Sequence, residues 1–205
     1  MAERLSPELA RRVRLVVLDV DGVLTDNGIY VGRNEAGPVE LKRFDVQDGL
    51  GVKMMVWAGI QVVLVSGRES YATTLRAAEL GIEAHQDGDA RKIPLLESIL
   101  ERLGADWQEV AMVADDLADL PVLRKVGLPV AVANAVAEVR ARARWCTRTP
   151  GGHGAVREFS EELLKARGVW SDLVDAYCRS REHGDITEHF ADIRAGRGRT
   201  VARES

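Results

Sequence analysis

The sequence of 205 residues is poor in several features that mark particular classes of protein. It has two cysteines, Cys146 and Cys178, without CxxC spacing, so the simplest interpretation is a pair of structural thiols in a reduced compartment. No apolar run approaches the roughly 20 residues that a membrane-spanning helix needs. The N-terminus is charged and has no signal-peptide pattern. We therefore expect a soluble, cytoplasmic protein without a membrane partner.

An excess of positive charge is also missing. Lys and Arg number 28 against 32 Asp and Glu, which gives a formal net charge of -4. This balance argues against a nucleic-acid partner, because no basic surface is available to neutralise phosphates. The length suits one domain, and we place it at residues 1–180. Residues 181–205 are predicted to form a helical or disordered extension.

Apolar segments alternate with amphipathic segments through most of the chain. Continuous apolar strands of this kind are typical of a parallel sheet that is covered by helices on both faces, so the expected fold class is α/β. Two short extended segments flank a polar stretch at 33–38, which predicts a projecting β-hairpin. The expected strands are 13–18, 60–65, 82–85, 110–114 and 128–132, and the expected helices are 48–58, 70–80, 90–103, 117–126, 155–165 and 170–177.

Two carboxylates, Asp19 and Asp21, directly follow the first expected strand and precede Gly22. Open α/β sheets bind ligands at the carboxyl ends of their strands. Two like charges at such a position are costly unless a cation or a reacting anion compensates them. This acidic pair therefore favours Mg²⁺-dependent phosphate chemistry over a structural role.

Polar residues follow other expected strands in the same way. They are Ser66, Gly67 and Arg68 after the strand 60–65, Lys92 at the start of a helix, and Asp115, Asp116 and Asp119 after the strand 110–114. With these four elements in order, the chain resembles the haloacid dehalogenase-like phosphohydrolases over residues 13 to about 160. The resemblance implies a three-layer Rossmann-like fold with a central parallel sheet. One departure is Ala114, which stands where that family usually has Gly.

The resemblance also implies a role for each residue. Asp19 would attack phosphorus to form an aspartyl-phosphate, and Asp21 would protonate the leaving alkoxide and then activate water. Mg²⁺ would be held by Asp19, the backbone carbonyl of Asp21, and Asp115. Ser66 and Lys92 would bind the phosphoryl oxygens. Asp116 and Asp119 would orient these groups without binding the metal or the substrate themselves.

The spacing of the motifs leaves no room for a cap domain, because Asp21 and Ser66 are 45 positions apart. The segments 44–51, 119–121 and 151–158 further resemble the 3-deoxy-D-manno-octulosonate 8-phosphate phosphatases, capless tetramers of the route to lipopolysaccharide. This resemblance implies a hairpin flap at about 28–44, a homotetramer, and a sugar acid phosphate as substrate. The candidate substrate contacts are Gly67, Arg68, Arg76 and Arg157. The three arginines are included because guanidinium groups suit anions.

Two alternatives remain open from the sequence. One is a related phosphatase that acts on a nine-carbon keto-sugar acid 9-phosphate. The other is a non-catalytic subunit on the same scaffold, suggested by Ala114 and the C-terminal extension. Within that extension, His183 and His189 are interpreted as solvated, and Ile186, Phe190 and Ile193 as a packing stripe that follows a capping box at 185–188.

Overall fold

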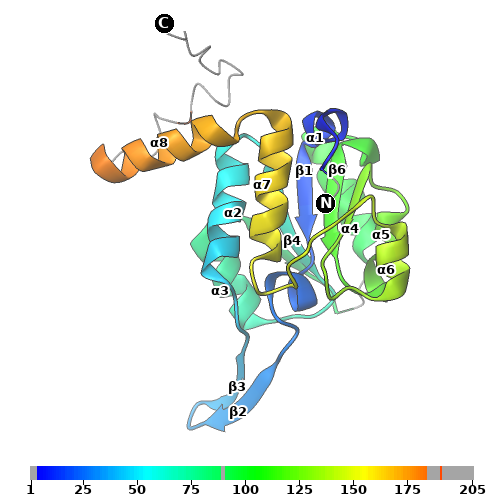
Figure 1. The fold of residues 1–205 in the computed structure, drawn as a ribbon. Helices are drawn as coiled ribbons and strands as arrows, with labels where there is room; N and C mark the ends of the chain where they lie inside the picture. The colour runs from blue at the N-terminus through cyan, green and yellow to red at the C-terminus, as the bar shows by residue number, and fades with distance from the viewer. Residues whose placement is uncertain (1–3, 89–90, 184–189, 191–205) are drawn as a thin grey trace, which may run out of the picture.

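A six-stranded sheet forms the centre of the protein (Figure 1). The computed structural model describes residues 4–88, 91–183 and 190. Every neighbouring pair in the sheet is parallel, in the order β5-β4-β1-β6-β7-β8. The expected α/β class is therefore confirmed. The strands are β1 (Leu15–Leu18), β4 (Gln61–Ser66), β5 (Glu83–Gln86), β6 (Val110–Ala114), β7 (Leu128–Ala131) and β8 (Trp145–Cys146).

The helices form two groups that lie on either side of the sheet (Figure 1). In one group α2 and α1 pack against α7, while α3 contacts α2 and α8 contacts α7; in the other, α5 contacts both α4 and α6. The helices are α1 (Pro7–Arg12), α2 (Val46–Trp57), α3 (Tyr71–Leu80), α4 (Lys92–Leu103), α5 (Leu120–Leu123), α6 (Ala137–Arg142), α7 (Ala155–Arg167) and α8 (Trp170–His183).

The two central strands lie in the core and fix the position of the polar residues that follow them. Every residue of β1 and of β6 has no exposed surface, because helices cover both faces of the sheet. The chain leaves β1 toward β4 on one side, and β6 lies on the other side. The order of strands thus reverses beside β1, and ligands bind at such a point in open α/β sheets. Asp19 and Asp115 are the first residues after these strands.

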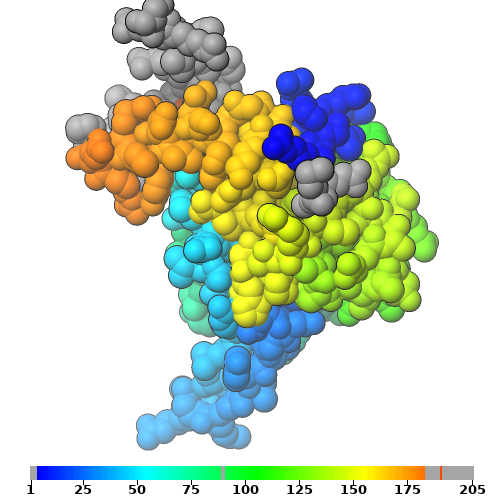
Figure 2. All heavy atoms as spheres, viewed as in Figure 1, coloured from blue at the N-terminus to red at the C-terminus, as the bar shows by residue number. Residues whose placement is uncertain are grey.

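The predicted hairpin is present as β2 (Tyr30–Asn34) and β3 (Gly37–Leu41), an antiparallel pair outside the main sheet. It extends away from the body of the protein, on the side toward which β1 runs (Figures 1 and 2). A single bridge between Thr25 and Phe44 closes its base. Among the described residues, the elements between β1 and β4 are a π-helical turn (Val20–Leu24), this hairpin and α2, so no cap domain is inserted there.

Several elements differ from the prediction. The expected helix at 117–126 is a 3₁₀ turn (Leu117–Asp119) followed by the single-turn helix α5. Asp116 caps that turn by accepting a hydrogen bond from the Leu117 N–H at 2.7 Å, and Pro121 lies in the first turn of α5, so the chain changes helix type between them. Strand β8 and helix α6 were not predicted, since a two-residue strand has no periodicity to detect.

Helix α8 continues six residues beyond the predicted end at Tyr177, to His183. Phe190 is buried and stacks on Trp57 of α2, with ring centroids 4.6 Å apart. The predicted packing role of Phe190 thus has a partner within the same chain. Ile186, His189, Ile193 and the capping box lie outside the described residues. In the part of the chain that is described, no helix combines the length and apolar character that crossing a membrane requires.

Candidate active site

The segment from Asp19 to Thr25 forms a tight turn at the end of β1. Asp19 donates its N–H to the Val113 carbonyl at 3.1 Å, which carries the strand pairing with β6 one residue further. The Thr25 hydroxyl closes the turn, because it donates to the Val20 carbonyl at 3.2 Å and accepts from the Gly22 N–H at 3.3 Å. The turn is therefore held by its own hydrogen bonds, and the two carboxylates keep fixed places in it.

Glycine is required at the centre of this turn for two reasons. Gly22 has φ of 89°, a conformation that L side chains rarely adopt, and a Cβ atom there would overlap the Asp115 carboxylate. A Cβ atom at Gly151 would likewise overlap the Gly22 carbonyl, so the two backbones can approach only without it. Asn134 joins the two segments, since its amide donates to the Gly22 carbonyl at 3.2 Å and its carbonyl accepts from the Gly151 N–H at 2.7 Å. The Gly-Gly segment thus supports the turn of its own chain.

Three buried carboxylates converge beside the turn. Asp19, Asp115 and Asp119 are 9%, 5% and 1% exposed, and one oxygen from each lies within 4.8 Å of the others. Asp115 Oδ1 is buried and has no hydrogen-bond partner within the described residues. A buried carboxylate oxygen without a donor is costly, so this arrangement suits a cation.

Lys92 is the positive group within the cluster. Its Nζ lies 2.6 Å from Asp19 Oδ1 and 2.5 Å from Asp119 Oδ1, and the residue is 5% exposed. Lys92 begins α4, whereas Asp119 ends the turn after β6, so residues on both sides of β1 meet at this ammonium group. Asp119 therefore holds Lys92 against Asp19.

The cluster contains more negative charge than Lys92 can balance. Burial raises the pKa of Asp115 to about 7, and burial likewise raises the pKa of Asp119 to about 7, with the Asp19 carboxylate adding to both shifts. Burial raises the pKa of Asp19 in spite of Lys92. Burial lowers the pKa of Lys92, but Asp19 and Asp119 outweigh it and the net shift is upward. A divalent cation at this point would relieve the repulsion between the carboxylates.

Ser66 ends β4 and turns the chain at the same edge. Its hydroxyl accepts from the Arg68 N–H and donates to the Arg68 carbonyl, both at 3.1 Å, so Gly67 lies inside a closed turn. Arg68 Nη2 lies 2.5 Å from Glu40 Oε2, and Ser70 donates its hydroxyl to Glu40 Oε1 at 2.6 Å. Glu40 belongs to β3, so the hairpin contributes to the position of the Arg68 side chain.

Lys42 was not singled out from the sequence, yet it contacts a proposed catalytic residue. Its Nζ lies 2.7 Å from Asp21 Oδ1, and its side chain has no exposed surface. The signal that could have found it is its place directly after β3, near the Thr25–Phe44 bridge that brings the hairpin back to the turn. Asn134 was missed as well, although it follows strand β7 as the other polar residues follow theirs.

The two neighbours of Asp115 in the sequence, Ala114 and Asp116, differ in exposure. Asp116 is exposed and its carboxylate accepts the Leu117 N–H, so it shapes the turn that brings Asp119 inward. Ala114 is fully buried and keeps regular pairing with Ala131 of β7. The extra methyl group of Ala114 is thus accommodated within the sheet.

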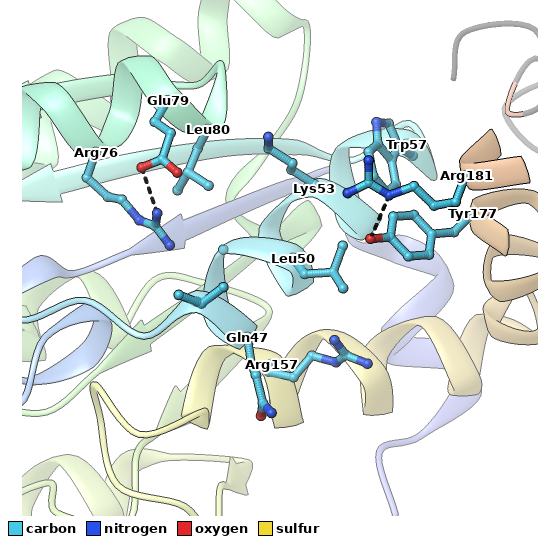
Figure 3. Close-up of a pocket in the computed structure, with 12 residues that line it drawn as sticks. Gln47, Leu50, Lys53, Trp57, Arg76, Glu79, Leu80, Arg157, Tyr177 and Arg181 are labelled. Atoms are coloured by element: carbon cyan, nitrogen blue, oxygen red, sulfur yellow. Dashed lines mark hydrogen bonds and ion pairs between the residues drawn. The ribbon is translucent and has the colours of Figure 1, made fainter. Parts of the chain in front are cut away.

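Arg76 and Arg157 line a cavity of about 470 Å³ between α2, α3, α7 and α8 (Figure 3). None of the three clustered carboxylates is among its lining residues. Arg76 is paired with Glu79 at 2.8 Å, and Arg157 with Glu161 at 2.8 Å. Both guanidinium groups therefore have partners inside the subunit. Their proposed contact with substrate stays a prediction.

The comparisons with known proteins agree with this geometry. A family model described as haloacid dehalogenase-like hydrolase matches residues 85–159. The 3-deoxy-D-manno-octulosonate 8-phosphate phosphatase KdsC of Escherichia coli K12 is 44% identical over 159 residues, which are 78% of this chain and 83% of that protein. The protein of the same name from Salmonella typhi is 43% identical over the same length.

Solved structures give the same result. The 3-deoxy-D-manno-octulosonate 8-phosphate phosphatase of Moraxella catarrhalis, in complex with magnesium, phosphate and KDO, has a TM-score of 0.77 and 35% identity, covering 83% of this chain and 97% of that one. A probable YrbI family phosphatase from Pseudomonas syringae has a TM-score of 0.76 and 42% identity, covering 84% and 98%.

Proposed function

This chain belongs to the KdsC family of haloacid dehalogenase-like phosphatases, and on that premise we propose that it hydrolyses 3-deoxy-D-manno-octulosonate 8-phosphate with Mg²⁺ through an aspartyl-phosphate. The observation that carries the proposal is the buried group of Asp19, Asp115, Asp119 and Lys92 at the carboxyl edge of the sheet. Membership of a phosphatase family weighs against the alternative of a non-catalytic subunit.

The residues of the site fit a magnesium ion. Asp115 offers a buried oxygen without a donor, and Asp19 offers a second carboxylate within 4.8 Å. We propose these two carboxylates and the Asp21 carbonyl as the ligands, because hard oxygen atoms are what Mg²⁺ prefers. Asp119 lies in the same cluster, but Lys92 occupies one of its oxygens. When bound, the ion would reduce the repulsion between Asp19 and the phosphate and stabilise charge on the phosphoryl oxygens.

Each side chain then has a defined task. Asp19 attacks phosphorus while the ester oxygen leaves, and Asp21 donates the proton that this oxygen needs. In the second step Asp21 accepts a proton from the water that attacks the aspartyl-phosphate, which releases phosphate and regenerates Asp19. Lys92 and Ser66 bind the phosphoryl oxygens. Lys92 contacts Asp19, and Ser66 is the last residue of β4, the strand beside β1.

Substrate selection is proposed to depend on groups near the hairpin. Arg68 and Gly67 lie beyond Ser66, and Arg68 remains 43% exposed on its side chain despite its contact with Glu40. A guanidinium group in this place could bind the carboxylate of a sugar acid. An eight-carbon and a nine-carbon keto-sugar acid share that carboxylate, so both substrates are compatible with Arg68.

The test is phosphate release from the eight-carbon 8-phosphate and the nine-carbon 9-phosphate, with Mg²⁺ or with EDTA. We expect turnover of the eight-carbon compound in Mg²⁺ alone, and a loss of at least about 1,000-fold for Asp19→Asn, which removes the nucleophile. Asp175→Asn on α8 is the matched control and should keep full activity. Retained activity in Asp19→Asn would contradict the mechanism, and faster turnover of the nine-carbon compound would reassign the substrate.

We also propose that the protein assembles as a homotetramer through the hairpin. Its strands expose large apolar side chains, with Tyr30 61%, Val31 78% and Leu41 62% exposed. Tyr30 and Leu41 are paired across the hairpin and therefore share one face. An apolar face on a projecting element favours a protein contact, and a second copy would also cover a site that has no cap. A cytoplasmic location stays a prediction.

A further inference from the structure

A buried lysine from the hairpin lies behind Asp21. Lys42 Nζ is 2.7 Å from Asp21 Oδ1, and the Lys42 side chain has no exposed surface, whereas the Asp21 side chain is 22% exposed. Within the described residues Asp21 is the one carboxylate that Lys42 contacts as an ion pair. The Asp21 carboxylate is thus the more exposed partner of the pair, and Lys42 has no surface of its own to offer a substrate.

The position of Lys42 follows from the strand that carries it. Side chains along a strand alternate between its faces, so Glu40 and Lys42 share one face and Leu41 points to the other. Glu40 contacts Arg68 and Ser70, whereas Leu41 is 62% exposed. One face of β3 and its continuation thus brings a carboxylate and an ammonium group to the site, and the opposite face is apolar and exposed.

The Asp21 side chain depends on this contact. The approach of Lys42 to Asp21 Oδ1 is an ion pair without a well-directed hydrogen bond, and Oδ1 itself has no hydrogen-bond partner among the described residues. The turn around Thr25 fixes the backbone on either side of Asp21, but its hydrogen bonds do not involve the Asp21 carboxylate. Lys42 is thus the group that can fix its direction.

We propose that Lys42 is a positioning residue that holds the Asp21 carboxylate in the direction needed for proton transfer. This inference rests on the proposed function, because it assigns Lys42 to the same site. Lys42 acts through Asp21 and takes no part in any bond that forms or breaks. Proton transfer requires a carboxylate within hydrogen-bond reach of the leaving oxygen, so a rotated Asp21 would be inefficient even though it is present.

A double-mutant cycle separates this role from a general effect on folding. The four proteins are wild type, Lys42→Met, Asp21→Asn and the double variant, each assayed in Mg²⁺ with the sugar acid 8-phosphate and with p-nitrophenyl phosphate. We expect Lys42→Met to lower kcat about 10- to 100-fold with KM changed less than about three-fold. In the Asp21→Asn background, the same substitution should change kcat less than about two-fold.

The result that would overturn the proposal is an equal loss from Lys42→Met in both backgrounds, because Lys42 would then act independently of Asp21. Unchanged kcat in Lys42→Met would overturn it as well. Lys125→Met is the matched control, since Lys125 is 41% exposed and pairs with Glu97 away from the acidic cluster, and it should retain wild-type kcat. Should Lys42→Met not fold, Lys42→Gln is used in the same cycle.

The outcome also distinguishes this inference from the proposed function. A wild type that hydrolyses p-nitrophenyl phosphate but not the sugar acid phosphate would refute the substrate. The cycle on the aryl phosphate would then test Lys42 in the second step, where Asp21 activates water, because p-nitrophenolate leaves without a proton. A wild type without activity on either compound would overturn both. The rise in Tm on adding Mg²⁺ should be the same in Lys42→Met as in wild type, because none of the clustered carboxylates is changed.

Discussion

The acidic edge of the sheet and the hairpin depart from the usual distribution of residues in opposite ways. At the edge, Asp19, Asp115, Asp119 and Lys92 are charged and buried. On the hairpin, Tyr30, Val31 and Leu41 are apolar and exposed. Most proteins avoid both arrangements, since an unbalanced buried charge is costly and an exposed apolar face associates. The first region suits a metal ion, and the second suits a protein contact.

The difference concerns what each region must bind to become stable. The carboxylates need a small ion that diffuses in freely, so their completion depends on the concentration of a metal. In the proposed tetramer the apolar face would be covered by another copy of the chain, so its completion would depend on the concentration of the protein itself. Lys42 and Glu40 connect the two, because they lie on the hairpin strand or at its end and contact Asp21 and Arg68.

The largest effect is expected from removing a charge at the acidic edge. Asp115→Ala deletes the carboxylate that has a buried oxygen without a donor, and it should lower kcat/KM at least about 1,000-fold by abolishing metal binding. Isothermal titration with Mg²⁺ should show no binding to the variant. Binding of Mg²⁺ with unchanged affinity would mean that Asp115 is not a ligand.

The second prediction concerns the pH dependence of metal binding. The pKa values of Asp115 and Asp119 are raised to about 7, so both carboxyls take up protons below that pH, and protons then compete with the metal. Saturating Mg²⁺ should raise Tm by about 5 °C at pH 8 and by much less at pH 5.5. An equal rise at both pH values would show that Asp115 does not hold the ion.

The same shifts determine the stability of the metal-free protein. Because the folded pKa values exceed the usual value of 3.8, the folded state binds more protons than the unfolded state between about pH 4 and 7. These two groups therefore reduce stability as pH rises through that range. In Asp115→Ala the reduction should be smaller, which thermal denaturation in EDTA can measure.

The third prediction addresses the hairpin. Tyr30→Asp together with Leu41→Asp places charge on the exposed apolar face and should shift the mass in light scattering from tetramer toward monomer, because like charges would face each other across the contact. The site residues are unchanged, so Mg²⁺ binding should persist. A tetramer of unchanged mass would place the assembly contact elsewhere.

The smallest effect is expected at Asp48, which lies apart from both regions. Its buried carboxylate accepts the Arg157 N–H at 2.7 Å and the Gly154 N–H at 3.3 Å at the start of α7, and burial raises its pKa to about 6. Protonation below pH 6 thus favours the folded state. The Tm of wild type relative to Asp48→Asn should fall by roughly 5 °C as pH rises from 4 to 6 and stay constant above 7.

The sequence was sufficient to predict the strands that carry the site. Strand 110–114 has the predicted bounds, because an uninterrupted apolar run leaves no other way to bury its side chains. Asp19 and Asp115 follow buried strands and Ser66 ends one, and this placement could be predicted from the sequence within one residue. The bounds of the elements near Asp119 could not be predicted, since hydrogen bonds from Asp116 and the presence of Pro121 override helical periodicity there.

The contact of Lys42 with Asp21 could not be predicted from the sequence for a different reason. A lysine after an exposed strand is ordinarily a solvated charge, and periodicity contains no information on which way the hairpin returns. Long-range side-chain contacts of this kind require the three-dimensional arrangement.

The packing of Gly151 against Gly22 has a consequence for the order in which the protein matures. Asp19, the proposed nucleophile, lies in the first tenth of the chain, but the segment that supports its turn is more than 120 positions later. During synthesis Asp19 leaves the ribosome early, whereas Asn134 and Gly151 emerge only when most of the sheet has been made. The turn is thus completed last, and a nascent chain cannot begin phosphate chemistry before its fold is nearly closed.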